Sequence, residues 1–208
     1  MKIIEDTAVI EILKKEFINL HDLLPSEFQD DFNKYAFISG GCIYSLHNDK
    51  EPKDFDFFVI DKEYSNKLLS YFKNQDIKPF KNLLQGKYKD LHLMISKYAI
   101  SIGKYQIVVK YVGDIKSVVD QFDFRHNQYA YYDNQIHNFS GGDYINSNEL
   151  SFNDERARDI CGCILRLPKF IKRGMTISKK ETAKMLSKLK DNGFDDAEIE
   201  ILKDYTTY

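Results

Sequence analysis

Two aspartates one residue apart, Asp54 and Asp56, stand in the otherwise apolar segment "KDFDFFVI" (residues 53–60). Alternate residues of a β-strand project to the same face, so the two carboxylates would lie together, with Phe55 and Phe57 on the opposite face. Neighbouring carboxylates repel each other, and an unpaired charge in a buried strand is costly. A divalent cation relieves both problems, and Mg²⁺ prefers oxygen ligands while it keeps positions open for substrate phosphates. The pair therefore predicts a metal site.

A glycine pair, Gly40 and Gly41, lies shortly before the aspartates. It follows the apolar run "YAFIS" (35–39) and precedes "CIYSLHN" (42–48), a segment suited to a short helix. A strand that turns into a helix through glycines leaves free backbone N–H groups, and the missing side chains let a phosphate approach them. Either motif alone is more often structural. Their order, strand, glycine pair, helix, loop and aspartate pair, favours nucleotide chemistry.

The elements that must position these motifs follow from the apolar periodicity. A helix is expected over about the first 30 residues, with Pro25 breaking the pattern. Beyond it we expect strands at 35–39, 55–60, 92–102 and 105–112, helices at 42–48, 62–74 and 114–122, and a hairpin over 126–139 that turns at Asp133-Asn134. Strands and helices thus alternate in the first two thirds of the chain.

The last third has a different character. Three helices are expected at 153–173, 178–191 and 195–205, with Asn153 or Asp154, Ser178 and Asp195 as their N-caps. The order of elements predicts an α+β fold in two parts, a mixed α/β domain over residues 1–145 and a helical region over residues 146–208.

The composition limits the classes of function. The chain has 208 residues, 43% of them apolar and 30% charged, with a net charge of -2. These values are typical of a soluble globular protein and argue against a surface that binds nucleic acid all round, although they allow a local basic patch. Apolar runs fall short of the ~18 residues of a membrane span, and the N-terminal residues lack the features of a signal peptide. Three cysteines fit a reducing compartment, so we expect a cytoplasmic protein.

The first motifs resemble the signature of the nucleotidyltransferase superfamily that includes DNA polymerase beta and the tRNA CCA-adding enzymes. Gly40, Gly41 and Cys42 match its glycine motif, with Cys42 where serine is frequent, and Asp54 and Asp56 match its aspartate motif. Further on, the chain to about residue 178 is similar to nucleotidyltransferase-like proteins of phages and large viruses, in "QFDFRHNQYAYYDNQIH" and "LRLPKFIKRGMTIS".

The resemblance implies a polymerase beta-like mixed sheet flanked by helices and a metal-dependent activity. Asp54 and Asp56 would hold Mg²⁺ or Mn²⁺, and Gly40, Gly41 and Cys42 would bind the nucleoside triphosphate. The enzyme would transfer NMP from the NTP to an acceptor hydroxyl. The acceptor class, RNA, a small molecule or a protein, stays open.

Two positions depart from the family pattern. The CCA-adding subgroup carries an Arg-Asp pair soon after the glycines, where this chain has Tyr44 and Ser45, which argues against tRNA end maturation. Active members also place a third carboxylate on a later strand, where "YQIVVK" offers Gln106, whose amide cannot accept the proton. The nearest substitute is Asp123, a candidate catalytic base whose alternative is a turn residue bonded to backbone N–H groups.

Basic residues of the expected helix 153–173 supply a further candidate. Arg166, Lys169 and Arg173 are spaced to share one face and would bind the triphosphate or a nucleic-acid backbone, the alternative being a solvated surface. Besides the enzyme, we consider a catalytically silent module that binds a nucleotide or nucleic acid, which the absent third carboxylate favours. A purely structural protein would leave the aspartate pair unexplained.

Overall fold

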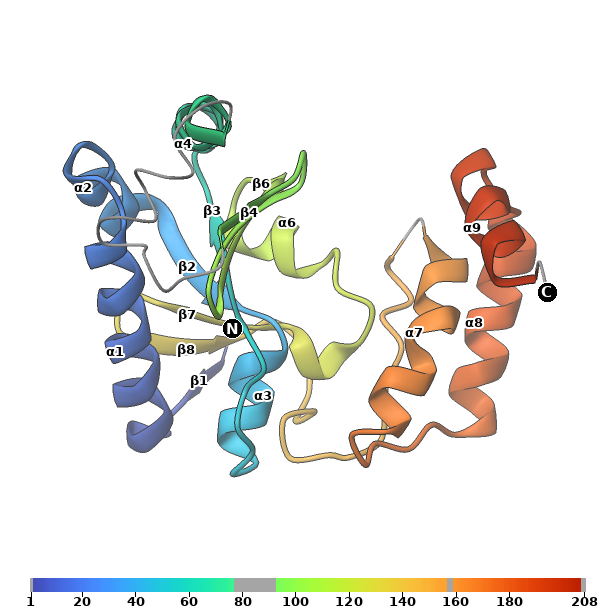
Figure 1. The fold of residues 1–208 in the computed structure, drawn as a ribbon. Helices are drawn as coiled ribbons and strands as arrows, with labels where there is room; N and C mark the ends of the chain where they lie inside the picture. Colours follow the sequence, from blue (N-terminus) through green and yellow to red (C-terminus); the bar gives the residue numbers. More distant parts are fainter. Residues whose placement is uncertain (1, 77–92, 157–158, 207–208) are drawn as a thin grey trace.

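The computed structural model describes residues 2–76, 93–156 and 159–206. Its centre is a single mixed sheet in the order β1-β8-β7-β2-β3-β6-β5-β4, in which β3 and β6 run parallel and the other neighbours run antiparallel (Figure 1). The strands are β1 (Lys2–Ile4), β2 (Ala36–Ser39), β3 (Phe55–Val59), β4 (Leu93–Ile95), β5 (Ala99–Ile102), β6 (Tyr105–Val112), β7 (Tyr129–Tyr132) and β8 (Gln135–Asn138). The predicted α+β class with a mixed sheet is confirmed.

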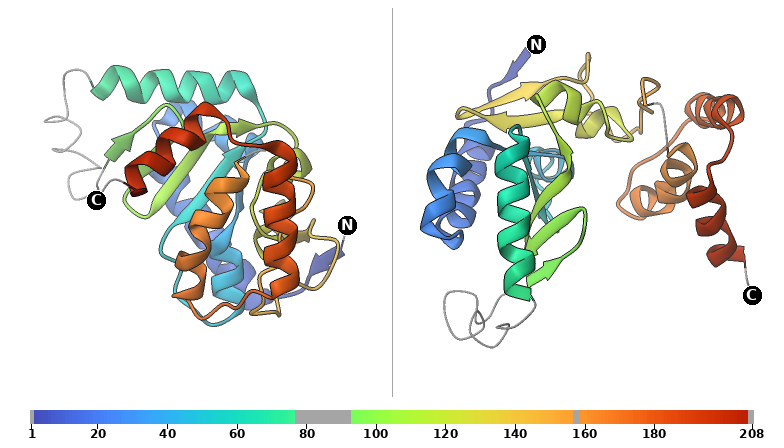
Figure 2. Two further views of the ribbon diagram at one scale, coloured as in Figure 1. Left: turned by 90° about the vertical axis from the view of Figure 1, so that its right-hand side faces the viewer. Right: turned by 90° about the horizontal axis from the view of Figure 1, so that it is seen from above.

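Helices flank the sheet and continue beyond it. They are α1 (Thr7–Leu23), α2 (Ser26–Tyr35), α3 (Gly41–His47), α4 (Lys62–Asp76), α6 (Ile115–Val119), α7 (Ile160–Ile171), α8 (Lys179–Asn192) and α9 (Asp196–Thr206), with a 3₁₀ helix, η1 (Arg125–Asn127). Figure 2 shows α7, α8 and α9 gathered on one side of the molecule, beside the layers formed by the sheet and α1, α2 and α4. No helix among the described residues is long and apolar enough to cross a bilayer.

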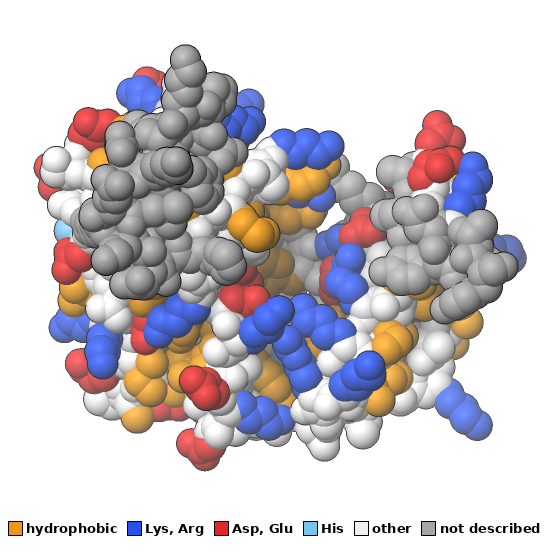
Figure 3. Space-filling view, in the orientation of Figure 1, with side chains coloured by type: hydrophobic (Ala, Val, Ile, Leu, Met, Phe, Trp, Pro, Cys, Tyr) orange, Lys and Arg blue, Asp and Glu red, His pale blue; other side chains and the backbone are white. Residues whose placement is uncertain are grey.

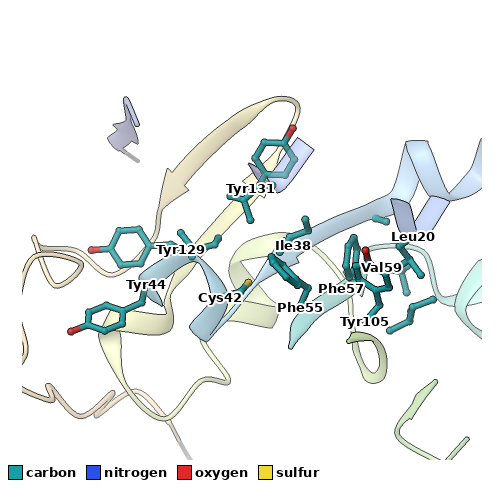
Figure 4. Close-up of a cluster of buried hydrophobic side chains, with 14 of the residues drawn as sticks. Leu20, Ile38, Cys42, Tyr44, Phe55, Phe57, Val59, Tyr105, Tyr129 and Tyr131 are labelled. Atoms are coloured by element: carbon teal, nitrogen blue, oxygen red, sulfur yellow. The ribbon is translucent and has the colours of Figure 1, made fainter. Parts of the chain in front are cut away.

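The main core lies between the sheet and the layer of α1, α2 and α4. Leu13 and Leu20 of α1 are fully buried in one cluster with Phe57 of β3 and Ile107 of β6, because their spacing places them on one face of the helix. Figure 4 shows Leu20 close to Phe57, Val59 and Tyr105 in this cluster. Burial of such apolar side chains contributes about 1.5–3 kcal/mol each, so this face of β3 is held firmly.

A smaller core covers part of the opposite face of the sheet. Phe37 of β2, Phe58 of β3 and Ala130 of β7 pack there against Val118 and Val119 of α6. Strands β2 and β3 are therefore apolar on both faces over most of their length, as their near-continuous apolar sequences predict. Asp56 interrupts this pattern on the α6 face of β3.

Most of the predicted strands and hairpins are confirmed. The turn between β7 and β8 has Asp133 and Asn134 at φ of 50° and 59°, the left-handed conformation that a two-residue hairpin needs. The single strand expected over 92–102 is wrong in one respect: within the described residues it forms two strands, β4 and β5. The chain reverses at Ser96, whose hydroxyl accepts bonds from the backbone N–H groups of Tyr98 and Ala99.

The N-terminal segment also differs from the expected continuous helix. Residues Lys2–Ile4 pair with β8 as an edge strand, and α1 begins only after Asp6, whose carboxylate accepts from the backbone N–H of Val9 at 3.1 Å. The helical run then breaks at Pro25, as predicted, and resumes as α2 up to Tyr35.

The predicted start of the helix over 153–173 is wrong. Residues 153–156 and Asp159 are not helical, because the Asn153 amide donates to the carbonyls of Asp120 (2.8 Å) and Phe122 (3.0 Å) and holds the chain against the sheet part of the molecule. Neither Asn153 nor Asp154 caps a helix; α7 follows Asp159, at φ 56°.

The two later caps are confirmed. The Ser178 hydroxyl accepts from the backbone N–H of Glu181 at 3.3 Å, and the Asp195 carboxylate accepts from that of Glu198 at 2.8 Å. Apolar residues on either side of residue 145 belong to the same main core, among them Ile145, Leu150, Phe152, Ile160, Cys163, Phe170, Met175 and Met185. The helical region therefore packs on the α/β part, and a domain boundary at 145 stays a prediction.

Candidate active site

The glycine pair and the aspartate pair meet in the structure. Ser39, the last residue of β2, pairs with Asp56 of β3, so Gly40 comes directly after the strand position opposite Asp56. A Cβ atom on Gly40 would lie 3.3 Å from Asp56 Oδ2, and Gly40 has a φ of 94°, which L side chains rarely adopt. Glycine at this position lets the backbone approach the carboxylate closely. The two motifs therefore form one site.

The two aspartates differ in their surroundings. Asp54 precedes β3 and is exposed, whereas Asp56 is half-buried between Phe55 and Phe57, whose side chains point into the main core. Burial, and secondly the negative charge of Asp54, raise the pKa of Asp56 to about 7, while Lys169 opposes the shift. The two carboxylates thus repel each other, as the sequence predicts, and no ion pair to Asp56 is found among the described residues.

The donor set fits a metal ion that is shared with a substrate. Within residues 2–76, 93–156 and 159–206, no three His, Cys, Asp or Glu side chains are grouped so that they could hold an ion by themselves. Asp54 and Asp56 offer two carboxylates only. Magnesium is commonly held by one or two carboxylates together with water and substrate phosphates, so the pair suits Mg²⁺ bound with a nucleotide.

Cys42 takes part in packing. Its side chain is buried, its Sγ lies 3.7 Å from the Ser39 carbonyl oxygen, and burial together with the charge of Asp56 raises the pKa of the thiol. The thiol is therefore protonated near neutral pH. Any phosphate contact at this position, which remains a prediction, would fall to the backbone N–H.

The position beside Asp56 on the next strand holds an amide. In the parallel pairing of β3 and β6, Asp56 lies next to Gln106, whose Nε2 donates to Ser101 Oγ of β5 at 3.3 Å. Ser39, Asp56, Gln106 and Ser101 thus form a polar row across four neighbouring strands. The expected third carboxylate is absent from this row.

Asp123, the predicted substitute, is engaged by two arginines. Its carboxylate accepts from Arg166 through Nε at 2.6 Å and through Nη2 at 3.1 Å, and it forms an ion pair with Arg156 at 3.3 Å. A carboxylate in such a bidentate pair has its oxygens occupied by guanidinium donors, so it is not free to accept a hydrogen bond from a substrate hydroxyl. The geometry therefore gives Asp123 a structural environment, and its catalytic role stays a prediction.

Asp123 belongs to a four-residue network that we call the arginine–aspartate cluster: Asp123, Arg156, Asp159 and Arg166. Asp159 binds both arginines at 2.9 Å, and these neighbours hold its pKa below the usual range although burial opposes the shift. The cluster fastens the start of α7 to the loop that follows α6. Gly162 makes room for it, because a Cβ atom there would lie 2.1 Å from Asp159 Oδ1.

The three predicted cations of the helical region have different surroundings. Arg166 is bound in the arginine–aspartate cluster. Lys169, near the end of α7, is exposed and its charge reaches Asp56. Arg173, just beyond α7, lines a pocket beside the glycine pair. Lys169 and Arg173 are thus placed next to the predicted metal and phosphate sites, whereas Arg166 is already paired.

A pocket of about 260 Å³ opens beside Gly41, and we call it the glycine-side pocket. Lys50, Lys53 and Arg173 supply positive charge at it, opposed by Glu51. Its other lining residues are Tyr44, Ser45, His126, Asn127, Phe170 and Met175. Lys and Arg side chains gather where the sheet part meets the helical region, around a hollow in the surface (Figure 3). The charges and the concave shape suit a polyanionic ligand with an apolar end.

Sequence reasoning missed most of this pocket. Lys50 and Lys53 lie in the loop just before Asp54, so their position next to Asp54 in the sequence could have predicted that they lie near the site. His126 and Asn127 come from η1, more than 70 positions away, and no local pattern places them there. A larger pocket of about 430 Å³ lies between α1, α2 and the β7–β8 turn, but none of the predicted site residues line it.

Comparison with known proteins relates the chain to a family and to a fold. The model of a family described as Gabija anti-defense 2 family protein matches residues 12–150. No curated protein matches. The solved structures that match include the Thermotoga maritima CCA-adding enzyme complexed with tRNA, at 19% identity and a TM-score of 0.57, covering 92% of this chain and 47% of that one.

Two further CCA-adding enzyme structures match in the same range. The complex with ATP has 16% identity and a TM-score of 0.57, covering 92% of this chain and 47% of that one. The complex with CTP has 15% identity and a TM-score of 0.50, covering 87% and 46%. This chain spans less than half the length of these structures. At such identities the likeness is one of fold, and it confirms the expected polymerase beta-like nucleotidyltransferase architecture.

Proposed function

The chain belongs to the Gabija anti-defense 2 family, and we propose that it is a metal-dependent nucleotidyltransferase. It would transfer NMP from an NTP to an acceptor hydroxyl and release pyrophosphate. One observation carries the proposal: Gly40 lies against the carboxylate of Asp56, which brings a phosphate-accessible backbone and a pair of repelling carboxylates to one place. A structural protein gains nothing from that juxtaposition, since the raised pKa of Asp56 reflects an unfavourable charge.

The metal-binding residues of this proposal are Asp54 and Asp56. They would hold Mg²⁺ or Mn²⁺ together with the triphosphate. When bound, the ion neutralises phosphate charge and makes the α-phosphate more electrophilic. Asp54 is exposed and Asp56 is half-buried. The electrostatic attraction to a cation is stronger for the half-buried carboxylate, because the effective dielectric constant is lower there.

The backbone at Gly40 and Gly41 would bind the triphosphate, with Cys42 contributing its N–H group. Lys169, whose charge reaches Asp56, and Arg173, which lines the glycine-side pocket, would balance the remaining phosphate charge. In phosphoryl transfer, positioning and electrostatic stabilisation of this kind supply most of the catalysis. Arg166 would act indirectly, by holding α7 through Asp123.

The family's name connects its members with counteracting Gabija defence, and we extend that role to this chain. The acceptor hydroxyl would then belong to a component of the Gabija system, and its chemical class, RNA, protein or small molecule, can be read from the labelled product. The bound tRNA, ATP and CTP of the solved structures belong to those proteins.

The second candidate function is a silent nucleotide-binding module. The amide of Gln106 beside Asp56 favours it, because a side-chain amide cannot take the proton from an attacking hydroxyl. Such a protein would counter Gabija by binding a nucleotide without turnover.

Radiolabelled NTPs separate the two functions. The full chain is incubated with each α-³²P-NTP, with Mg²⁺ or Mn²⁺, and with RNA, protein and small-molecule fractions of cells that carry Gabija. Asp54→Asn and Asp56→Asn variants and cells without Gabija are the controls. Label transferred by the wild type and lost in both variants supports the enzyme. Metal-dependent nucleotide binding with no transfer supports the silent module, and the absence of any nucleotide binding contradicts both.

A further inference from the structure

The polar row across the sheet limits which acceptor can react. Gln106 stands beside Asp56 where a base is expected, and the Asp123 carboxylate is occupied by Arg156 and Arg166. A site without a general base favours a nucleophile that loses its proton easily. The hydroxyls of sugars, serine and threonine do not ionise in the ordinary pH range, whereas the phenol of tyrosine ionises at about pH 10. The site therefore favours a phenolic acceptor.

Tyr98, in the turn between β4 and β5, is the tyrosine that the structure displays most openly. It is 45% exposed, and the other tyrosines whose side chains are described are buried or half-buried. Its backbone is held in place, because the Tyr98 carbonyl accepts from the N–H groups of Val109 at 2.8 Å and Lys110 at 3.1 Å in β6. The phenol therefore projects into solvent from a fixed turn.

Two lysines surround the ring of Tyr98. Lys97 Nζ lies 4.7 Å and Lys110 Nζ 5.0 Å from its centroid, and neither lysine forms an ion pair within residues 2–76, 93–156 and 159–206. Lys97, and secondly Lys110, lowers the pKa of Tyr98, whereas burial raises the pKa of tyrosines such as Tyr44 and Tyr129. The exposed hydroxyl of Tyr98 thus loses its proton more readily than an ordinary phenol.

Tyr98 does not reach the aspartate pair of its own chain. Gln106 is the residue of β6 beside Asp56, and Tyr98 is bonded to β6 at Val109 and Lys110, further along the strand. A strand rises about 3.3 Å per residue, so about 10–13 Å separates the two places. A tyrosine side chain is shorter than this gap. A second copy of the chain is needed to bring the phenol to the site.

We propose that the chain transfers NMP to the Tyr98 hydroxyl of a second copy, in addition to an acceptor in the Gabija system. The inference rests on the proposed function, because the same site would hold the NTP. The phenolic oxygen attacks the α-phosphorus, the bond from that phosphorus to the oxygen bridging to the β-phosphate breaks, and pyrophosphate leaves. The phenolic proton passes to solvent.

The product of this step suits the surroundings of Tyr98. It is a phosphodiester between the nucleoside and the tyrosine, and it carries a negative charge. Lys97 and Lys110 lie beside the ring and supply the positive charge that stabilises it. The same two lysines thus favour both the attacking form of the side chain and its modified form.

Self-labelling of the full chain tests the inference. The chain is incubated with each α-³²P-NTP and Mg²⁺ or Mn²⁺ without another acceptor, and mass spectrometry of its peptides locates the NMP group. We expect NMP on Tyr98, and Tyr98→Phe should lower the label at least about 10-fold, because it removes only the nucleophilic oxygen. Tyr111→Phe is the matched control and should keep the label, since Tyr111 lies by the same Lys110 at 5.1 Å but is half-buried.

Removal of the two charges tests the activation of the phenol. Lys97→Gln combined with Lys110→Gln keeps the acceptor, and should lower the rate of self-labelling about 3- to 10-fold because the phenol becomes less acidic. An unchanged rate overturns the activation of Tyr98 by its neighbours.

A mixture of two variants tests transfer between copies. Asp56→Asn lacks a predicted metal ligand but keeps Tyr98, whereas Tyr98→Phe keeps the site but lacks the acceptor. Neither should label itself at Tyr98, yet in the mixture the Asp56→Asn chain, distinguished by an affinity tag, should carry the label. An unlabelled Asp56→Asn chain overturns transfer between copies. Circular dichroism verifies folding, and Asp54→Asn replaces Asp56→Asn if the latter does not fold.

The failures of the two proposals are distinguishable. Label on an RNA, protein or small molecule of cells that carry Gabija, with none on Tyr98, overturns this inference and leaves the proposed function intact. So does label on the chain that persists in Tyr98→Phe. If neither the chain nor any cell fraction is labelled, the proposed enzymatic function and this inference both fail.

Discussion

The aspartate pair and the arginine–aspartate cluster place carboxylates beside a glycine in opposite ways. At the pair, Asp56 lies against Gly40 with another carboxylate as its neighbour, and its pKa is raised to about 7. In the cluster, Asp159 lies against Gly162 with two guanidinium groups bound to it, and its pKa is lowered. One site leaves negative charge uncompensated and the other compensates it completely. Uncompensated charge held in place by a rigid fold is typical of a site that awaits a ligand.

The strongest test of this contrast removes one charge at the pair. Asp56→Asn keeps the shape of the side chain but removes a metal ligand, so we expect NMP transfer to fall by at least about 10³-fold, measured by label incorporation. The same change removes the repulsion with Asp54, so the melting temperature of the metal-free protein should stay unchanged or rise. A large loss of stability would mean that Asp56 is structural.

The glycine of the cluster is expected to matter for stability. In Gly162→Ala the new Cβ would meet Asp159 Oδ1 and Arg166 Nη1, the ends of two side chains, so both must shift and the geometry of the cluster changes. We expect a loss of about 1–3 kcal/mol in the free energy of unfolding, measured by urea denaturation, because the ion pairs of the cluster are weakened. An alanine variant as stable as the wild type would contradict the packing of Asp159 against α7.

Asp123→Asn distinguishes structure from catalysis at the predicted third acid. The change leaves buried Arg156 without one of its charged partners, and we expect a loss of about 1–3 kcal/mol of stability. At a temperature where the variant is fully folded, turnover should stay within about 10-fold of the wild type, since the carboxylate is occupied by arginines. A sharp fall in turnover of the folded variant would restore Asp123 as a catalytic base.

The raised pKa of Asp56 predicts how metal binding depends on pH. A proton must leave Asp56 before a cation binds, so below about pH 7 the affinity for Mn²⁺ should fall up to ~10-fold per pH unit. Above pH 7 the carboxylate is already ionised and the affinity should level off. Calorimetric titration with Mn²⁺ from pH 5 to pH 8 measures the profile, with Asp56→Asn as the control that lacks the dependence.

The smallest effect is expected at Lys169. Its charge lowers the pKa of Asp56 without a direct ion pair, so Lys169→Gln should move the midpoint of the Mn²⁺ profile to higher pH. Nucleotide affinity should fall only about 3- to 5-fold, because an exposed lysine contributes modestly. No change in either quantity would place Lys169 outside the site.

Local patterns in the sequence were enough for the core of the fold and for the central motifs. The strand–glycine–helix–aspartate order was correct because all its parts lie within about 20 residues and pair as neighbouring antiparallel strands, which is the simplest connection. The predicted hairpin of β5 and β6 also formed, and it carries Gln106. That this strand offers no carboxylate was already visible in "YQIVVK". The start of α7 was missed because tertiary bonds of Asn153 override the local helical tendency.

The residue types at 40, 41, 54 and 56 follow from chemistry that any chain must satisfy: glycine for a close backbone approach, and carboxylates for a cation. The local sequence does not determine which of these carboxylates is neutralised by a positive charge, because the partners are distant along the chain. Arg166 is 43 residues from Asp123 and binds it all the same. Asn127 reaches Gly41 only when η1 packs on α3. Electrostatic energy depends on distance in space, so packing, and no local pattern, separates the compensated carboxylates of the cluster from the uncompensated ones beside the glycines.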